Sequence, residues 1–189
     1  MIPSALEVAN ALYGCWRLAR SDPSAVSYFN DSVAGFWRSF FAAVIILPGH
    51  VLLLALRPEP IPEDAAIVRF VAVEAITYVI GWVAFPLIMA RLCEAIDRRD
   101  QFILFIVAFN WSQILQLAIY LPVLLLRRVD VAPSHLAGIL TVAAIVAILV
   151  YSWYIARTTL KVGGMTAVGV IALHEIVALF ILQISKSLI

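Results

Sequence analysis

Residues 102–126 read FILFIVAFNWSQILQLAIYLPVLLL, a segment of membrane-spanning length with polar side chains deep inside it. These side chains share one face, because at about 100° per residue on an α-helix they fall within a sector of roughly 120°. They are Asn110, Gln113, Gln116 and Tyr120. Hydrocarbon offers such groups no hydrogen-bond partner, so the segment predicts a helix with one polar stripe that neighbouring helices must cover.

The composition of the whole chain indicates a protein of the lipid bilayer. Hydrophobic residues make up 64% of its 189 residues and charged residues only 13%, well outside the range of an ordinary soluble domain. The formal net charge is +1 and the chain has no dense run of lysine and arginine, which argues against nucleic acid as a partner. We therefore expect an all-α, polytopic integral membrane bundle surrounded by lipid.

Five apolar segments come close to the roughly 20 residues that a helix needs to cross the hydrocarbon core. We expect the spans at residues 33–56, 65–90, 102–126, 135–156 and 162–184. A proline removes a backbone donor, so Pro48 predicts a kink inside the first span. The connector 57–64 holds three prolines and three acidic residues and predicts a stiff exposed loop. The charged connector 91–101 predicts a short solvated helix.

The amino-terminal segment, residues 1–32, predicts an interfacial unit ahead of a transmembrane domain at residues 33–189. Polar residues recur every three or four positions between Ser4 and Arg20, with apolar residues opposite them, as in an amphipathic helix. This helix is too short to span a bilayer, so it either lies along the membrane surface or packs against its own spans. Asp22 and Pro23 end it, and Asn30, Asp31 and Ser32 are candidate caps for the next helix.

Large aromatic and basic side chains mark where the helices are expected to meet the lipid headgroups, because aromatic rings favour that level and an arginine can extend to phosphates. The candidates are Trp16, Trp37, Arg38 and Trp153. The excess of basic residues in the connectors on the amino-terminal side favours a cytoplasmic amino terminus and a carboxyl terminus outside. We expect a bacterial inner membrane as the location.

Several polar side chains lie deep in the expected spans and form the candidate site. They are Glu74, Asn110, Gln113, Gln116, His174 and Glu175. An ionisable group inside a membrane is a functional candidate, since it can relay protons or line the path of a solute. The alternative is a structural role, because amide side chains bond neighbouring helices together and a protonated glutamate can do the same.

No catalytic signature accompanies these residues. His174 and Glu175 resemble the start of a zinc-protease motif, but Ala178 occupies the position of the second histidine. The sequence has no GxSxG turn and no glycine-rich phosphate loop. Cys15 and Cys93 do not have the spacing of metal ligands. We expect a protein that is not an enzyme and that holds neither a cofactor nor a metal.

Two short motifs add a family resemblance to this architecture. Leu12-Tyr13-Gly14 resembles the LYG core of the DLYGP motif of the Yip-domain family of five-span membrane proteins, and Tyr120-Leu121-Pro122 resembles the tyrosine and proline of that family's third span. Ala11 and Cys15 stand where the motif has aspartate and proline, and Ile119 stands where a glycine precedes the tyrosine. The resemblance implies a cytoplasmic amino-terminal segment before five spans. For eukaryotic members it implies trafficking and small-GTPase partners, and for bacterial members only a membrane protein.

Large apolar surface, short loops and the missing catalytic residues together predict a non-enzymatic scaffold or an accessory subunit of a membrane complex. Its partners would be other membrane proteins or further copies of the chain. The alternative is a small transporter or a lipid-handling protein that uses Glu74, Gln113 and Glu175. The two predictions differ in whether the deep polar side chains enclose a cavity.

Overall fold

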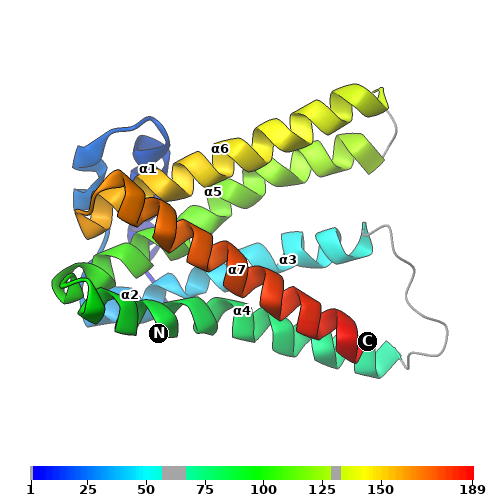
Figure 1. The fold of residues 1–189 in the computed structure, drawn as a ribbon, viewed down its shortest axis with the longest axis horizontal. Helices are drawn as coiled ribbons and strands as arrows, with labels where there is room; N and C mark the ends of the chain where they lie inside the picture. The colour runs from blue at the N-terminus through cyan, green and yellow to red at the C-terminus, as the bar shows by residue number, and fades with distance from the viewer. Residues whose placement is uncertain (1, 57–66, 129–132) are drawn as a thin grey trace.

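The computed structural model describes residues 2–56, 67–128 and 133–189 (Figure 1). Its helices form from the long apolar segments of the sequence, and polar side chains cap some of them. Every element in these residues is helical. The α-helices are α1 (Ala5–Ala19), α2 (Val33–Ser39), α3 (Phe41–Ala55), α4 (Ile67–Ala95), α5 (Phe102–Arg128), α6 (Ser134–Leu160) and α7 (Gly164–Leu188), and the 3-10 helices are η1 (Pro23–Tyr28) and η2 (Arg99–Gln101).

Polar side chains cap the helices of the amino-terminal segment. Ser4 Oγ accepts a hydrogen bond from the backbone N–H of Glu7 at 3.1 Å, and Ser32 Oγ accepts one from Gly35 at 3.0 Å. Asp22 caps η1 in the same way. These bonds satisfy N–H groups that the start of a helix leaves unpaired. Of the three candidate caps before α2, Ser32 is the one that caps it.

Five stretches of the described chain are long and apolar enough to cross a membrane. They are Val33–Ala55, Ile67–Ala95, Arg99–Arg128, Ser134–Leu160 and Gly164–Leu188. Together they confirm the predicted all-α fold with five membrane-length helices. The predicted connector 57–64 lies outside the described residues.

The first span is divided into two helices, which the sequence pattern did not predict. Helix α3 runs through Pro48 without a break, and the division between α2 and α3 falls at Phe40. Just before it, Ser39 Oγ donates a hydrogen bond to the carbonyl of Phe36 at 2.7 Å. A side-chain partner of this kind competes with the backbone bonds of the next turn, which favours an interruption here. The expected separate helix at 91–101 is also wrong in its first half, because α4 continues to Ala95.

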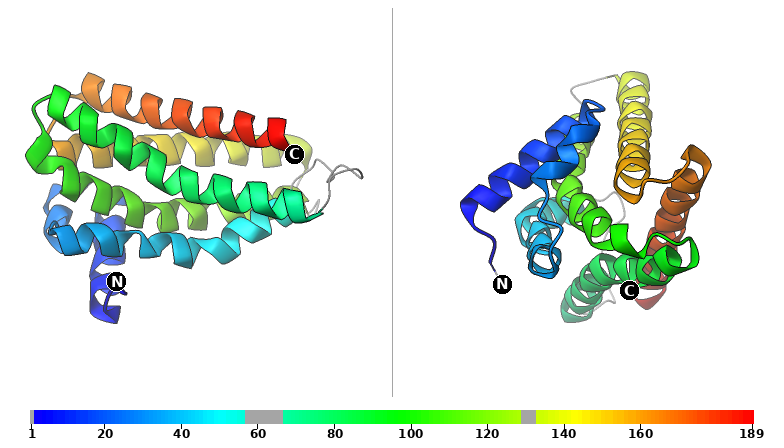
Figure 2. Two further views of the ribbon diagram at one scale, coloured as in Figure 1. Left: turned by 90° about the horizontal axis from the view of Figure 1, so that it is seen from below. Right: turned by 90° about the vertical axis from the view of Figure 1, so that its left-hand side faces the viewer.

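Helix α5 lies at the centre of the fold. Half of its most apolar stretch is buried, against 11% of that in α4 and 17% of that in α7. It packs against α1, α2, α3 and α6, and residues 105–112 are all buried. Figures 1 and 2 show the other long helices arranged around it, with the amino terminus at one end of the bundle and the carboxyl terminus at the other. The remaining helices therefore present broad apolar faces to their surroundings.

Helix α1 runs across one end of the bundle, transverse to the long helices (Figure 2). One face packs on α5 and α6, and Tyr151 of α6 donates a hydrogen bond from its hydroxyl to the carbonyl oxygen of Cys15 at 2.9 Å. The other face leaves Leu6, Tyr13 and Trp16 exposed. The helix thus packs against its own spans, and an apolar edge faces outward at the level expected for lipid headgroups.

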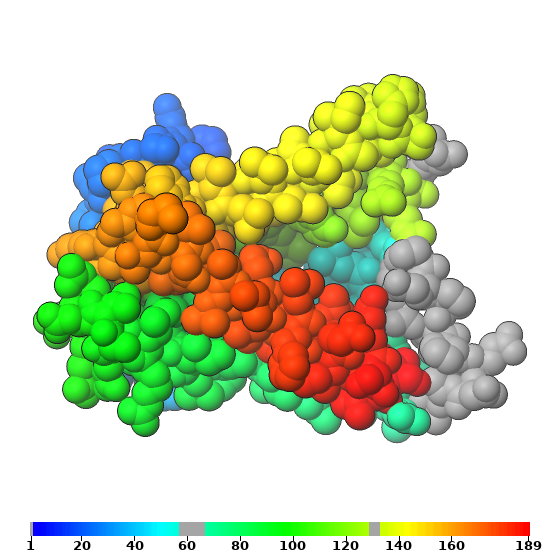
Figure 3. Space-filling model, viewed as in Figure 1, coloured from blue at the N-terminus to red at the C-terminus, as the bar shows by residue number. Residues whose placement is uncertain are grey.

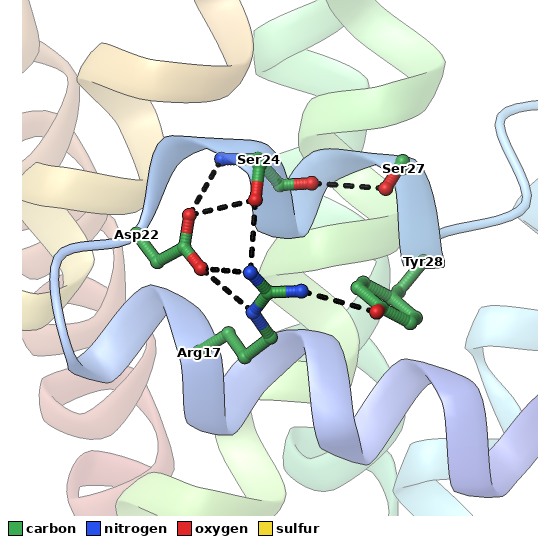
Figure 4. A network of polar contacts seen from close by, with 5 residues as sticks. All are labelled: Arg17, Asp22, Ser24, Ser27 and Tyr28. Carbon is green, nitrogen blue, oxygen red and sulfur yellow. Dashed lines mark hydrogen bonds and ion pairs between the residues drawn. The ribbon is translucent and has the colours of Figure 1, made fainter.

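A polar network fastens η1 to α1 (Figure 4). Arg17 forms an ion pair with Asp22, donates a 2.7 Å hydrogen bond to it from Nε, and reaches Tyr28 Oη and Ser24 Oγ at 3.0 Å each. Asp22 also accepts bonds from the hydroxyl and the backbone N–H of Ser24, and these, followed by Arg17, lower the pKa of its carboxyl group. The segment after α1 is therefore held in one conformation by charge-assisted bonds.

Arg38, predicted at the membrane interface, forms an ion pair with Glu7 within the protein. Its Nη1 donates to Glu7 Oε2 at 3.1 Å, and Glu7 Oε1 accepts a second bond from Asn30 Nδ2 at 2.9 Å. Glu7 lies on α1 and Arg38 on α2, so the carboxylate of Glu7 joins two helices. The sequence pattern gave no sign of this contact. The amphipathic pattern of α1 placed Glu7 toward water, and it could not show that a basic residue 31 positions away would meet it.

The thiol of Cys15 provides a probe of this packing. It is 1% exposed, and burial raises its pKa to about 12. At about pH 8 only about one molecule in ten thousand would carry the reactive thiolate. We expect no labelling of Cys15 by iodoacetamide in the native protein over hours and rapid labelling after unfolding, measured by mass spectrometry of the peptide. Fast native labelling would show that α1 leaves the bundle.

A candidate intramembrane binding cleft

A cleft of about 770 Å³ lies between α3, α4, α5 and α7. Figure 3 shows the hollow between α6 (yellow) and α7 (red), with atoms of α5 and α3 at its bottom. It occupies the half of the bundle that holds the carboxyl terminus, where α5 and α6 diverge from α7 (Figure 1). The opening lies on the side of the bundle, not at either end of the spans. It therefore faces the region that lipid chains would occupy.

Five of the six polar side chains predicted for the candidate site line this cleft. They are Glu74 from α4, Asn110, Gln113 and Gln116 from α5, and His174 from α7. Tyr120, the last member of the polar stripe, lines it as well. The stripe on α5 therefore faces the cleft, and the structure brings it together with polar groups from two other helices.

Glu175 lies apart from the other five. Its side chain is 47% exposed and is not among the groups that line the cleft. Consecutive residues on a helix point about 100° apart, so when His174 faces the cleft Glu175 must face elsewhere. Its carboxylate lies 3.1 Å from Nδ1 of His174.

Two of the α5 amides bond neighbouring helices together. Asn110 Nδ2 donates to Ser39 Oγ of α2 at 2.9 Å. Gln116 Nε2 lies within hydrogen-bond distance of Ser112 Oγ at 3.2 Å and of Ser152 Oγ of α6 at 3.3 Å. Both side chains are buried, where such bonds contribute about 1 kcal/mol or less each in a bilayer. One N–H of Asn110 and the amide nitrogen of Gln116 are therefore used within the protein.

Glu74 and Gln113 differ from these amides, because neither has a hydrogen-bond partner among the described residues. Both are half-buried in the cleft wall. A polar group that is withdrawn from water and left unbonded costs free energy, and this cost is greatest for a charge. A ligand or water in the cleft would satisfy them.

The pattern of the sequence missed His50. His50 lies within α3 and lines the cleft. Its ring centroid is 4.6 Å from that of Tyr78, whose hydroxyl donates to the carbonyl of Ala43 at 2.6 Å and so joins α4 to α3. His50 Nε2 is buried without a hydrogen-bond partner. A histidine in an otherwise apolar helix next to Gly49 was the available signal.

Aromatic rings form the deep end of the cleft. The rings of Phe85 and Phe109 lie 5.0 Å apart, and each lies less than 5 Å from the imidazole of His174, at 4.8 and 4.9 Å. Trp82 and Tyr78 continue this wall along α4, one and two turns from Phe85. The wall is therefore apolar over its faces, and polar atoms occur at defined points within it, as is typical of small-molecule sites.

The predicted interfacial aromatic residues lie near the end of the bundle that carries α1. Trp16 and Trp37 are more than half exposed. Trp153 is half-buried, donates from Nε1 to the carbonyl of Gly164 at 3.0 Å and carries the guanidinium of Arg157 at 5.3 Å from its ring. In the described ranges, no group of three or more histidine, cysteine, aspartate or glutamate side chains is placed to hold a metal ion.

Fold and cleft together define an all-α integral membrane protein, with five membrane-length helices in the described chain and a side-opening cavity among them. Comparison of the chain with protein-family models, with curated proteins and with solved structures finds no match. The resemblance to the Yip-domain family stays a prediction.

Proposed function

We propose that the protein binds a lipid-like amphiphile in the cleft and that it handles this molecule within the membrane. The observation that carries the proposal is the opening between α6 and α7 (Figure 3). A hydrocarbon chain can enter through it from the bilayer without crossing water. The volume of about 770 Å³ lies within the range of small-molecule sites.

The distribution of polar groups in the cleft favours an amphiphile over a purely apolar molecule. Glu74, Gln113 and the buried Nε2 of His50 have no hydrogen-bond partner in the described chain. They line the same space as Trp82 and Phe85, which offer apolar surface. A ligand with a polar head and an apolar chain satisfies both sets of groups, whereas a hydrocarbon alone leaves the polar set unpaired.

Filling the cleft tests the proposal. Gly81 lines it, and a Cβ added to Gly81 meets no atom within 4 Å. We expect Gly81→Trp to occupy the cleft without disturbing the helices and to weaken binding of a fluorescent long-chain fatty-alcohol probe at least tenfold. Gly169→Trp on α7 is the control, because Gly169 also has open space around it but lies outside the cleft. Equal binding by the two variants would contradict the proposal.

The exposed carboxylate of Glu175 favours a second function, that of a scaffold or accessory subunit. It lies near the middle of α7 with almost half of its side chain exposed, and a carboxylate in hydrocarbon needs a partner or a proton. One oxygen of this carboxylate lies 3.1 Å from Nδ1 of His174, and a donor side chain on the helix of another membrane protein would supply a partner for the other oxygen. Native mass spectrometry in mild detergent separates the two functions, since it reveals either a bound molecule of lipid mass or a bound protein.

A further inference from the structure

We infer that the cleft selects amphiphiles whose head group is a protonated amine, with Glu74 as its counter-ion. This inference rests on the proposed function and names the class of ligand. Three features of the cleft wall support the inference. They are Glu74, which is the one acidic side chain among the described residues that line the cleft, the acceptor atoms in the same wall, and the aromatic faces along α4.

The first feature is the position of Glu74. It lies seven residues into α4, which is about 10 Å along the helix axis from Ile67. The 29 residues of α4 exceed the length that crosses the hydrocarbon core, so this depth is near the boundary between headgroups and chains. A head group bound there would leave its chain free to extend along the cleft toward Phe85 and Phe109.

The second feature is the pair of acceptor groups in the cleft wall: the carboxylate of Glu74 and the side-chain carbonyl of Gln113 accept no hydrogen bond from the described residues. The described residues already bond one N–H of Asn110 and the amide nitrogen of Gln116. His50 presents a buried Nε2 without a partner, and a neutral imidazole can accept a bond through such an atom when the proton is on Nδ1. An ammonium group has three N–H donors and no acceptor, which complements a carboxylate and an imidazole.

The third feature is aromatic. Tyr78 follows Glu74 by one turn on the same face of α4, and Trp82 follows Tyr78 by another. Aromatic faces attract organic cations, tryptophan most strongly. No arginine lines the described part of the cleft, although arginine is the side chain best suited to phosphate and carboxylate. Lys186 is the basic residue at its rim, and it has an interaction of its own.

Probes with one chain and different heads test the inference. Hexadecylamine, hexadecanol and hexadecanoate would compete with the fluorescent alcohol probe for the purified full-length protein in a non-ionic detergent at neutral pH. We expect hexadecylamine to bind at least tenfold more tightly than hexadecanol. Glu74→Gln should reduce this preference to less than threefold and leave the affinity for hexadecanol unchanged. Glu175→Gln removes a carboxylate outside the cleft and should keep the full preference.

The outcomes separate this inference from the proposed function. If the amine and the alcohol bind equally, and both are excluded by Gly81→Trp, the cleft binds amphiphiles but the inference about the head group is wrong. Tightest binding of hexadecanoate would assign recognition to Lys186 and would also overturn it. If no probe binds and Gly81→Trp changes nothing, the proposed function fails as well.

Discussion

Gly35→Ala is expected to destabilise the protein by about 3 kcal/mol, although the same change in an ordinary helix stabilises it by up to about 1 kcal/mol. A Cβ at this position would overlap the carbonyl oxygen of Asn30 and would lie 2.7 Å from its Cγ and 2.8 Å from its carbonyl carbon. Two of these three atoms are backbone, so no rotation of a side chain relieves the overlap. The chain before α2 must move instead.

That movement would break the contacts that join α1 to α2. Asn30 donates to Glu7 at 2.9 Å, and Glu7 accepts from Arg38 at 3.1 Å. The side-chain oxygen of Asn30 also accepts from the hydroxyl of Ser32 at 2.7 Å, and Ser32 in turn caps α2. Displacing one residue therefore removes several coupled bonds, and such losses exceed those of separate exposed pairs.

The measurement is reversible unfolding in mixed detergent and SDS micelles, followed by circular dichroism. Gly169→Ala is the matched control, because a Cβ at Gly169 meets nothing within 4 Å, and it should leave the protein equally stable or more stable. Equal stability of the two variants would mean that the close approach of Asn30 to α2 is not maintained in the membrane protein.

The sequence predicted the features that depend on local pattern. Span length and hydropathy set the number of long helices, and the period of α5 set which side chains share a face. Asn110, Gln113 and Gln116 do face a common space with Glu74 and His174. These results follow because a helix fixes the direction of each side chain relative to its neighbours along the chain.

Features that depend on contacts between distant segments could not be predicted in the same way. Arg38 suits a lipid phosphate and a carboxylate equally well, and only the fold brings Glu7 to it. The pairing of His50 with Tyr78 requires the relative rotation of α3 and α4. The cleft itself arises because α7 packs against both α4 and α6 while α5 and α6 diverge from α7 toward the end of the bundle that holds the carboxyl terminus, a property of packing that no single helix encodes (Figure 1).

The polar side chains of the cleft include two groups, one that bonds helices together and one without hydrogen bonds in the described chain. This division indicates how one structure can serve both structural and binding roles. Asn110 and Gln116 use their donors to hold α5 against α2 and α6. Glu74 and Gln113, on the same cleft wall, have no such bonds in the described chain. In a bilayer, where apolar contact alone gives little net attraction between helices, the first pair stabilises the walls while the second pair is available to a ligand.

Phe105→Ala is expected to lower the free energy of unfolding by about 2 kcal/mol, less than in a water-soluble protein, because lipid surrounds the helices. Phe105 is completely buried behind the deep end of the cleft, with its ring 6.0 Å from that of Phe85 and 5.5 Å from that of Phe109. In water-soluble proteins such a truncation costs about 3–5 kcal/mol, of which part is the transfer of the side chain from water. Separated helices in a bilayer are surrounded by hydrocarbon, so that part is absent here.

The part of the cost that remains is the cavity. A space of about 100 Å³ at about 24 cal/mol per Å³ amounts to about 2 kcal/mol. Phe180→Ala on the exposed face of α7 is the matched control and should cost less than about 0.5 kcal/mol, because lipid replaces the ring there. Benzene fills apolar cavities of this kind and should restore part of the stability of Phe105→Ala alone. A loss near 4 kcal/mol would show that the separated state exposes Phe105 to water, and a loss equal to that of Phe180→Ala would show that the packing behind the cleft is loose.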